Sequence, residues 1–312
     1  MGTQYAYFNK TIMPLSEAKI GLMCHGFNYG TGCFEGIRGY YNAEKEEMYL
    51  LHLDPHLRRL RQSGKILFMD LPLSHAELIE TVLEVVRKSD FRQNVYIRPT
   101  LYKEDEVVGV RLHNLHDALS IYVAPMGQYV DTSGGLRVGI TSWRRIDDNM
   151  VPARAKVTGA YINSALAKTE AHHNGFDEAI FLNQNGHVAE GSAENLFMVR
   201  DGVLVTPQTT DNILEGITRR SVITLAKEEL GLKVEERPID RTELYIADEL
   251  FLCGTACQLA WVKEISHRTV GEGQIGPITE RLSALYQAAV TGELPQYHPW
   301  LTPVYQECFA GR

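Results

Sequence analysis

Hydrophobic and polar positions alternate along the first 125 residues in short strand-like runs, interrupted by two stretches with helical spacing. Ser74 and its capping-box partner Glu77 precede apolar residues at helical spacing, which predicts a helix there. An earlier helix is expected at Asp54 and Pro55, because Asp suits the N-cap and Pro the first helical position. Strands are predicted over residues 48–53, 94–102 and 118–125. This pattern predicts a small α+β domain over residues 1–125.

A second set of periodic segments follows a Gly-containing polar stretch at 126–135, which we interpret as an interdomain linker. Strands are predicted over 136–141, 178–182, 196–199, 203–206, 232–236, 249–253 and 261–264. Helices are predicted near 159–174, 217–230, 241–247 and 280–289, and the chain beyond Gly292 is expected to be irregular. These segments predict a larger second domain over residues 136–312.

Composition and charge restrict the class of partner. The 312 residues are 44% hydrophobic and carry 31 basic against 39 acidic side chains, a net charge of -8. This balance argues against a broad nucleic-acid or anionic-membrane surface and favours small-molecule partners. The sequence shows neither a signal segment nor an apolar run of membrane-spanning length, so a cytoplasmic protein is expected. Its five scattered cysteines predict reduced thiols.

Several motif-like spacings do not meet the requirements of the sites they suggest. A G-x-G-x-x-G match at 271–276 lacks the surrounding βαβ unit of a dinucleotide site. Cys253 and Cys257 are spaced C-x3-C and not as the redox motif C-x-x-C. Two histidine pairs have zinc-like spacing without neighbouring cysteines, so solvated loop histidines and no metal site are expected at His52, His56, His113 and His116.

Three separate stretches carry residues suited to one kind of chemistry. Glu190 and Glu194 lie directly before an apolar run, where a buried carboxylate requires a partner, and a cationic one is expected. Lys156 lies among small apolar residues, which favour the neutral amine of a Schiff-base lysine. The Gly-Ile-Thr entry to a helix at 216–218 could hold an anion. An amine, an acid and an anion cradle are the parts of a pyridoxal phosphate site.

Each of these residues also has a plain structural interpretation. Lys156 could extend along apolar surface with its ammonium group in water, and either glutamate could form a salt bridge or a turn. Thr218 could be a helix cap, and the small-residue turn at 254–256 is a second candidate anion cradle. From the residues alone, Glu190 and Glu194 remain equal candidates for the carboxylate that pairs with a pyridine nitrogen.

Taken in order along the chain, these short motifs resemble the class IV aminotransferases of pyridoxal phosphate fold type IV, most closely the branched-chain amino acid aminotransferases. The matching motifs are YGTGCFEGIR at 29–38, YIRP at 96–99, AKVTGAY at 155–161, EGSAENLF at 190–197, GITR at 216–219, GTA at 254–256, GELP at 292–295 and WLTP at 300–303. The resemblance covers nearly the whole chain. It implies a small α+β domain and a larger pseudo-barrel domain with the cofactor between them, in a homodimer or a higher assembly of dimers.

The resemblance also implies a role for individual residues. Lys156 would attach the cofactor and move a proton, Glu190 would pair with the pyridine nitrogen, and Tyr161 would hydrogen-bond the ring oxygen. The phosphate would be held by Arg59, Ile217, Thr218 and Thr255. The substrate pocket would be shaped by Tyr29, Phe34, Arg38, Tyr96, Arg98, Tyr129, Thr255 and Ala256, with Arg98 as the candidate for the side-chain carboxylate of glutamate.

The activity implied is ping-pong transamination of leucine, isoleucine and valine with 2-oxoglutarate, in branched-chain amino acid biosynthesis. The stretch after Pro99 departs from the common branched-chain pattern, because it carries Lys103 and three acids. Relatives that act on D-amino acids or (R)-amines therefore form an alternative. Two further alternatives are an aminodeoxychorismate lyase and a non-enzymatic pyridoxal phosphate carrier.

Overall fold

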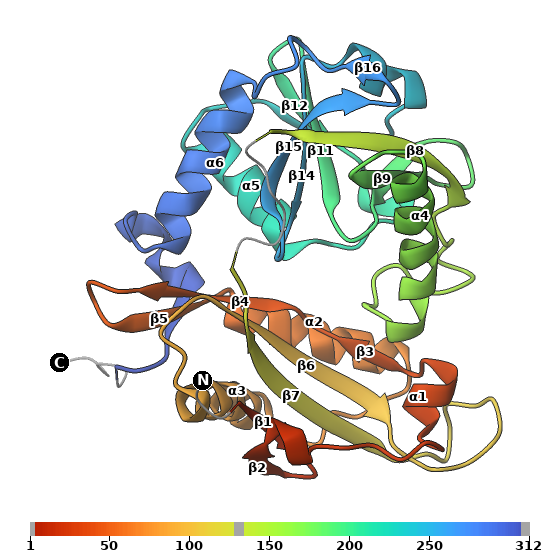
Figure 1. Ribbon diagram of the computed structural model, residues 1–312, viewed down its shortest axis with the longest axis vertical. Coiled ribbons are helices and arrows are strands. Elements are labelled where there is room, and N and C mark those ends of the chain that lie inside the picture. The colour runs from red at the N-terminus through yellow and green to blue at the C-terminus, as the bar shows by residue number, and fades with distance from the viewer. Residues whose placement is uncertain (1–3, 128–133, 307–312) are drawn as a thin grey trace. The chain divides into compact units, whose positions relative to one another are not determined.

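The computed structural model describes residues 4–127 and 134–306, and the chain separates into two compact units (Figure 1). Unit 1 comprises Met1–Gly127, Ala155–Gly159 and Ala288–Arg312, and unit 2 comprises Gln128–Arg154 and Ala160–Gln287. The sequence had placed all of 136–312 in one domain. The short segment around Lys156 and the C-terminal stretch instead belong to the N-terminal unit. Most of the predicted linker lies outside the described residues.

Unit 1 is built on an antiparallel sheet in which the long strands β6 (Val95–Lys103) and β7 (Asp117–Pro125) lie side by side (Figure 1). The strand order is β17 (Leu301–Pro303), β5 (Glu47–Leu51), β4 (Ile37–Asn42), β6, β7, β1 (Tyr5–Phe8) and β2 (Thr11–Pro14), with β3 (Gly32–Phe34) also paired to β6. Burial alternates along β6, so Ile97 and Leu101 face the core while Tyr96 and Arg98 face the other side. This second face is where the candidate site lies.

Helices α2 (Leu53–Ile66) and α3 (His75–Ser89) pack their apolar sides into the core of unit 1. The capping box between Ser74 and Glu77 is confirmed, since both reciprocal hydrogen bonds are present. The prediction that Asp54 caps α2 is wrong, because His52 occupies the N-cap with a left-handed φ of 51°. Asp54 instead lies in the first turn, where its carboxylate binds Arg58 and His75.

Lys103, which departs from the family pattern, lies on the core face of β6. Its side chain is 2% exposed, and Nζ lies 2.7 Å from the carboxylate of Asp117. The same ammonium group donates to the carbonyl oxygens of Phe68 and Leu115. The Lys103 side chain therefore points away from Tyr96 and Arg98, and its charge is balanced by Asp117 within unit 1.

Unit 2 is built on a mixed sheet. The strand order is β10 (Val188–Gly191), β9 (Glu178–Leu182), β8 (Leu136–Arg144), β15 (Gln258–Ile265), β14 (Glu249–Gly254), β11 (Asn195–Arg200), β12 (Val203–Thr206) and β13 (Val234–Glu236), with β16 (Arg268–Thr269) on β15. Strand β8 runs parallel to β9 and β15, β12 runs parallel to β13, and the other pairs are antiparallel. Helix α4 (Tyr161–His173) packs on β8 and β9, and α5 (Ile217–Glu228) packs on β14.

The remaining helices are α1 (His25–Tyr29), α6 (Pro277–Val290) and the 3-10 turns η1 (Leu15–Glu17), η2 (Thr158–Ala160), η3 (Thr209–Asp211), η4 (Arg241–Ile246) and η5 (Pro295–Trp300). The expectation of an irregular tail beyond Gly292 is wrong, because η5 leads into β17, which pairs with β5. Residues 25–29 also form the short helix α1, whereas the sequence predicted only the two helices at Asp54 and Ser74 in this part of the chain. Across residues 4–127 and 134–306, no helix combines the length and the apolar character needed to cross a membrane.

Candidate active site

Lys156 lies in unit 1, where backbone contacts hold it between β3 and α2. Its carbonyl oxygen accepts from the Phe34 N–H at 3.1 Å, and its own N–H donates to Ser63 Oγ at 3.2 Å. The Lys156 Nζ lies 5.1 Å from the centroid of the Phe34 ring. The amine is thus half-buried beside an aromatic face, and the main chain on both of its sides is fixed.

Arg59, predicted to bind phosphate, is held by a buried carboxylate that the sequence analysis did not identify. Its guanidinium meets Glu35 through two contacts, Nε to Oε1 at 2.6 Å and Nη2 to Oε2 at 2.8 Å. The His56 Nδ1 lies 2.6 Å from the same Oε2. Burial alone would raise the pKa of Glu35, but Arg59 and His56 lower this pKa to about 2.

His56 and His52 are therefore not the solvated loop histidines that were expected. His52 is 9% and His56 3% exposed, and burial lowers the pKa of His56. The expectation does hold for His113 and His116, which are exposed in the loop before β7. In the described residues, no group of three or more His, Cys, Asp or Glu side chains is arranged to hold a metal ion.

Phe34, Tyr96 and Arg98 form one aromatic and cationic cluster on the face of β6 opposite the core. The Arg98 guanidinium lies 4.5 Å from the Phe34 ring centroid, and its Nη2 donates to the Tyr96 hydroxyl at 2.7 Å. A Cβ at Gly36 would lie 2.6 Å from that hydroxyl oxygen, so a residue without a side chain is needed there. The cluster places a positive charge within apolar ring surface.

Two other predicted substrate residues make contacts inside unit 1. Arg38 is 3% exposed and donates to the Gly127 carbonyl at 2.8 Å. The Tyr29 hydroxyl accepts from the Gly109 N–H at 3.1 Å. Tyr129 lies outside the described residues. Tyr29 therefore anchors the loop between β6 and β7, and Arg38 holds the chain where β7 ends.

Glu190 lies in unit 2 at the end of β10, and each of its carboxylate oxygens has a donor. The Arg145 Nη2 lies 2.9 Å from Oε1, while Asn195 Nδ2 and the Leu214 N–H donate to Oε2 at 3.1 and 3.0 Å. Glu190 is 6% exposed. The expected cationic partner is confirmed and is Arg145, which the sequence analysis did not identify.

Glu194 lies four residues further on in a different electrostatic setting. Its Oε2 accepts from the Ala193 N–H at 3.0 Å, and the side chain is buried. Burial and the negative charge of Glu178 raise the pKa of Glu194 to about 8. At neutral pH Glu194 is therefore mostly a neutral acid, whereas Glu190 has the donor set of a carboxylate.

Helix α5 begins at Ile217 after the N-cap Gly216, and Ile217 and Thr218 are both buried. The first N–H groups of a helix have no acceptor within the helix, and its positive end favours an anion. The predicted anion cradle is thus a real helix start. Arg219 in the same turn is bonded to Glu236 at 2.7 Å and to the Pro207 carbonyl at 2.9 Å, so it supports the fold.

Asn195 connects Glu190 to this helix start. Its Nδ2 also donates to the Leu214 carbonyl at 3.0 Å, and a Cβ on Gly216 would lie 1.9 Å from its Oδ1. The remaining predicted residues of unit 2 lie at element ends: Tyr161 is the first residue of α4, and Thr255 and Ala256 form the turn between β14 and β15.

Replacing Gly216 with alanine is expected to destabilise the fold. The added methyl group would push away the Asn195 side chain and remove its hydrogen bonds to Glu190 and Leu214. Overpacking of this kind costs about 1–3 kcal/mol, measurable as a lower free energy of unfolding in urea. Gly134→Ala is the control, since a Cβ there meets no atom within 4 Å. Equal stability of the two variants would contradict the prediction.

Cys253 and Cys257 flank the turn that carries Thr255. Both thiols are buried, and burial raises the pKa of each. The prediction of reduced thiols is confirmed for Cys24, Cys33, Cys253 and Cys257, whereas Cys308 lies outside the described residues. These thiols have the environment of inert core residues.

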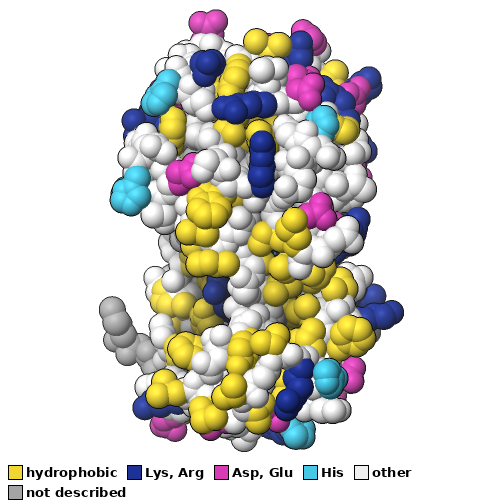
Figure 2. Space-filling model, turned by 90° about the vertical axis from the view of Figure 1, so that its right-hand side faces the viewer, with side chains coloured by type: hydrophobic (Ala, Val, Ile, Leu, Met, Phe, Trp, Pro, Cys, Tyr) yellow, Lys and Arg dark blue, Asp and Glu magenta, His cyan; other side chains and the backbone are white. Residues whose placement is uncertain are grey.

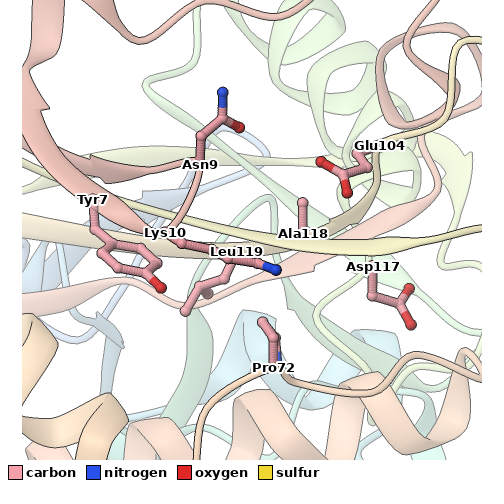
Figure 3. A pocket seen from close by; sticks show the side chains of 8 residues that line it. All are labelled: Tyr7, Asn9, Lys10, Pro72, Glu104, Asp117, Ala118 and Leu119. Carbon is pink, nitrogen blue, oxygen red and sulfur yellow. The ribbon is translucent and has the colours of Figure 1, made fainter.

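A cavity of about 190 Å³ lies elsewhere in unit 1, beside the first residues of β7 (Figure 3). Its lining includes Tyr7 from β1, Lys10 from the turn after it, Glu104 and Asp117. These residues are distinct from the predicted site residues. The cavity therefore does not contribute to the two groups built around Lys156 and Glu190.

Comparison with known proteins decides the family. Residues 32–265 match the family described as amino-transferase class IV. The chain belongs to this family. A probable branched-chain-amino-acid aminotransferase of Aquifex aeolicus is 51% identical over 303 residues, which cover 97% of each chain. As a class IV aminotransferase the protein is an enzyme, and the predicted fold type IV is confirmed.

Two solved structures of class IV aminotransferases are also similar. The branched-chain aminotransferase of Thermoproteus uzoniensis with norvaline has a TM-score of 0.93 and 42% identity, covering 97% of this chain and 100% of its own. The branched-chain amino acid aminotransferase of Thermobaculum terrenum in its PLP form has a TM-score of 0.93 and 40% identity, covering 98% and 99%.

Proposed function

We propose that this class IV aminotransferase uses pyridoxal 5'-phosphate to move an amino group between branched-chain L-amino acids and 2-oxoglutarate. The observation that carries the proposal is 51% identity along almost the whole chain to a relative named for that activity. The alternatives within the scaffold, D-amino acid or (R)-amine transamination and the lyase, have no such support. Cytoplasmic location and a role in branched-chain amino acid biosynthesis complete the proposal.

The residues of the two units fit the chemical parts of the cofactor. When bound, pyridoxal 5'-phosphate supplies an electron sink for the bonds at the substrate Cα. We propose that Lys156 attaches the cofactor, that Arg59 and the N–H groups of Ile217 and Thr218 bind its phosphate with Thr255, and that Tyr161 bonds its ring oxygen. The fit rests on the start of α5, where the first N–H groups of the helix can donate to an anion. Asn195 leaves no room there for a side chain at position 216.

Glu190 is proposed as the partner of the ring nitrogen, because its contacts keep it negatively charged. Arg145 lies on one carboxylate oxygen, and Asn195 and the Leu214 N–H donate to the other. A fixed negative charge stabilises a protonated pyridine nitrogen. No cationic side chain is seen to donate to Glu194 in the described residues, and its carboxyl group is mostly neutral at pH 7. Glu194 is therefore proposed to support the strand that follows it.

Lys156 is also proposed to carry the proton that leaves the substrate Cα. Its amine lies beside the Phe34 ring, and the main chain on either side is held by Phe34 and Ser63. An amine in a fixed position with reduced water contact is a suitable general base once it is neutral. The proton would be held at Nζ until it is returned.

The cluster of Phe34, Tyr96 and Arg98 suits a pocket that must accept two unlike substrates. The rings offer apolar surface to an aliphatic side chain, and the positive charge of Arg98, which Tyr96 and Phe34 hold in place, is proposed to attract the side-chain carboxylate of glutamate. Tyr29 and Ala256 are proposed to complete the pocket. Arg38 is proposed to support it by holding Gly127 in place.

A homodimer is proposed from the apolar surface around α1. Exposed large apolar side chains gather there and in the loop before β7: Ile20, Leu22, Met23, Phe27, Val108 and Val110, with Leu22 85% and Val110 89% exposed. Apolar side chains form patches on the face shown in Figure 2. His25 ties these segments together through Gly109 O at 2.8 Å. A preformed apolar surface of this kind is typical of a protein interface, and a second copy or a higher assembly of dimers is the proposed occupant.

Substrate preference is tested by following the cofactor spectrum in single half-reactions of the purified enzyme. L-leucine, L-valine and L-glutamate are expected to convert the cofactor at least about tenfold faster than D-alanine or an (R)-aryl amine, the discrimination that ~1.4 kcal/mol of pocket contacts gives. Faster conversion by D-alanine or by the amine would contradict the substrate assignment. Release of pyruvate without amino transfer would identify a lyase, and absence of turnover with every donor would identify a carrier.

A further inference from the structure

We propose that Glu35 is a positioning residue that fixes the guanidinium of Arg59 so that Arg59 can bind the phosphate group of the cofactor. This inference rests on the proposed function and adds a residue to the site. The contact between Glu35 and Arg59 is bidentate, with distances of 2.6 and 2.8 Å. Two parallel hydrogen bonds fix the plane of a guanidinium and therefore the directions of its other N–H bonds.

The main chain around Glu35 links this contact to the rest of the site. The Phe34 N–H is bonded to Lys156, the Glu35 N–H donates to the Pro99 carbonyl at 2.9 Å, and Gly36 makes room for Tyr96. Three successive residues thus contact the segment that carries Lys156, the guanidinium of Arg59 and the Tyr96 hydroxyl. The Glu35 side chain is fully buried, and it extends to α2, where Arg59 and His56 lie one turn apart.

The charges explain why a carboxylate is needed at position 35. Arg59 is 9% exposed, and a buried guanidinium without a counter-ion is costly. Glu35 balances that charge, and neutral His56 offers its Nδ1 to Oε2, so the carboxylate has donors on both oxygens. The negative charge of Glu35 reduces the net positive charge that Arg59 presents to a phosphate. We infer that Glu35 compensates by fixing the orientation of the guanidinium, so that less conformational entropy is lost when the phosphate binds.

Glu35→Gln distinguishes an effect of orientation from an effect of charge, because losing the fork should weaken phosphate binding whereas losing the negative charge should strengthen it. The amide has the same size, but its NH₂ group would face a donor on Arg59 or His56, which breaks the fork. We expect the affinity of the cofactor-free full chain for pyridoxal 5'-phosphate to fall at least about tenfold, the loss that goes with one charge-assisted hydrogen bond. Affinity for pyridoxal is expected to change less than about twofold, because pyridoxal lacks the phosphate group that Arg59 would bind. Glu84→Gln, at an exposed position on α3, is the matched control.

Each outcome of these titrations decides the proposal. Unchanged or tighter phosphate-ester binding by Glu35→Gln would overturn it, because removing a negative charge would then matter more than orientation. Equal weakening for both ligands would also overturn it, since the role would be structural only. A wild-type chain that binds neither ligand would instead refute the proposed function.

A second variant keeps the test valid if Glu35→Gln does not fold. Glu35→Asp retains the charge but shortens the side chain by one methylene, so it should lose one bond of the fork and show an intermediate loss of affinity. Arg59→Lys removes the fork from the other side. In a double-mutant cycle, Glu35→Asp is expected to add little loss to Arg59→Lys. Fully additive losses would overturn the proposal.

Discussion

Lys156→Ala is expected to abolish covalent cofactor attachment and to lower the transamination rate by at least about 10⁴-fold, since it removes both the attachment and a general base. The amine lies beside the Phe34 ring on a main chain that β3 and α2 hold. The two hydrogen bonds that hold this main chain are made by the backbone atoms of residue 156 and do not use its side chain. The variant should therefore fold and bind the cofactor only without a covalent bond. Borohydride reduction followed by mass spectrometry measures the linkage.

The control for this variant is Lys65→Ala, an exposed lysine in the last turn of α2. It should retain both the linkage and the rate, because its side chain lies in solvent. A Lys156→Ala protein that kept a borohydride-reducible linkage would refute the assignment. Such a result would direct attention to another amine and leave the family membership intact.

Glu190→Gln is expected to lower the rate by about 10²–10³-fold while the covalent linkage persists, comparable to loss of one strong electrostatic contact in an active site. The amide carries no charge to stabilise a protonated ring nitrogen. Its NH₂ group would also face either Arg145 or the two donors on Oε2. Steady-state rates and the absorbance of the bound cofactor measure the two effects separately.

Glu194→Gln serves as the matched control at neighbouring position 194. Burial and Glu178 raise the pKa of Glu194 to about 8, so below that pH its side chain is mostly a neutral acid that glutamine imitates. Little loss of rate is expected at pH 7. Above pH 8 the wild type gains a negative charge there that the variant lacks, so their rates should separate only at alkaline pH. Equal losses in Glu190→Gln and Glu194→Gln at pH 7 would contradict the distinction.

Local signals in the sequence predicted much of the fold. The capping box at Ser74 and the strands β9 and β12 were predicted because neighbouring residues determine them. The strand β17 was missed because its partner β5 lies some 250 positions earlier in the chain. The helix α1 was missed because glycine-rich sequence favours turns, and tertiary hydrogen bonds from His25 hold it in place.

The candidate site divides in the same way. Lys156, Glu190 and the α5 start could be proposed from residue type and setting, since each carries its own chemical signature. Glu35 and Arg145 carry no such signature, because their roles come from partners 24 and 45 positions away. The buried carboxylate expected at Glu190 or Glu194 implied a cation, but the sequence could not show which one. The identity of such partners depends on tertiary packing.

The side chain of Asn195 restricts which residues can occur at positions 190 and 216. Asn195 donates to Glu190 and to the Leu214 carbonyl, and it occupies the space that any side chain at position 216 would need. A larger residue at 216 can therefore be accepted only with a smaller one at 195, and that exchange leaves the Glu190 carboxylate with fewer donors. Positions 190, 195 and 216 are thus expected to vary together or not at all among homologous sequences.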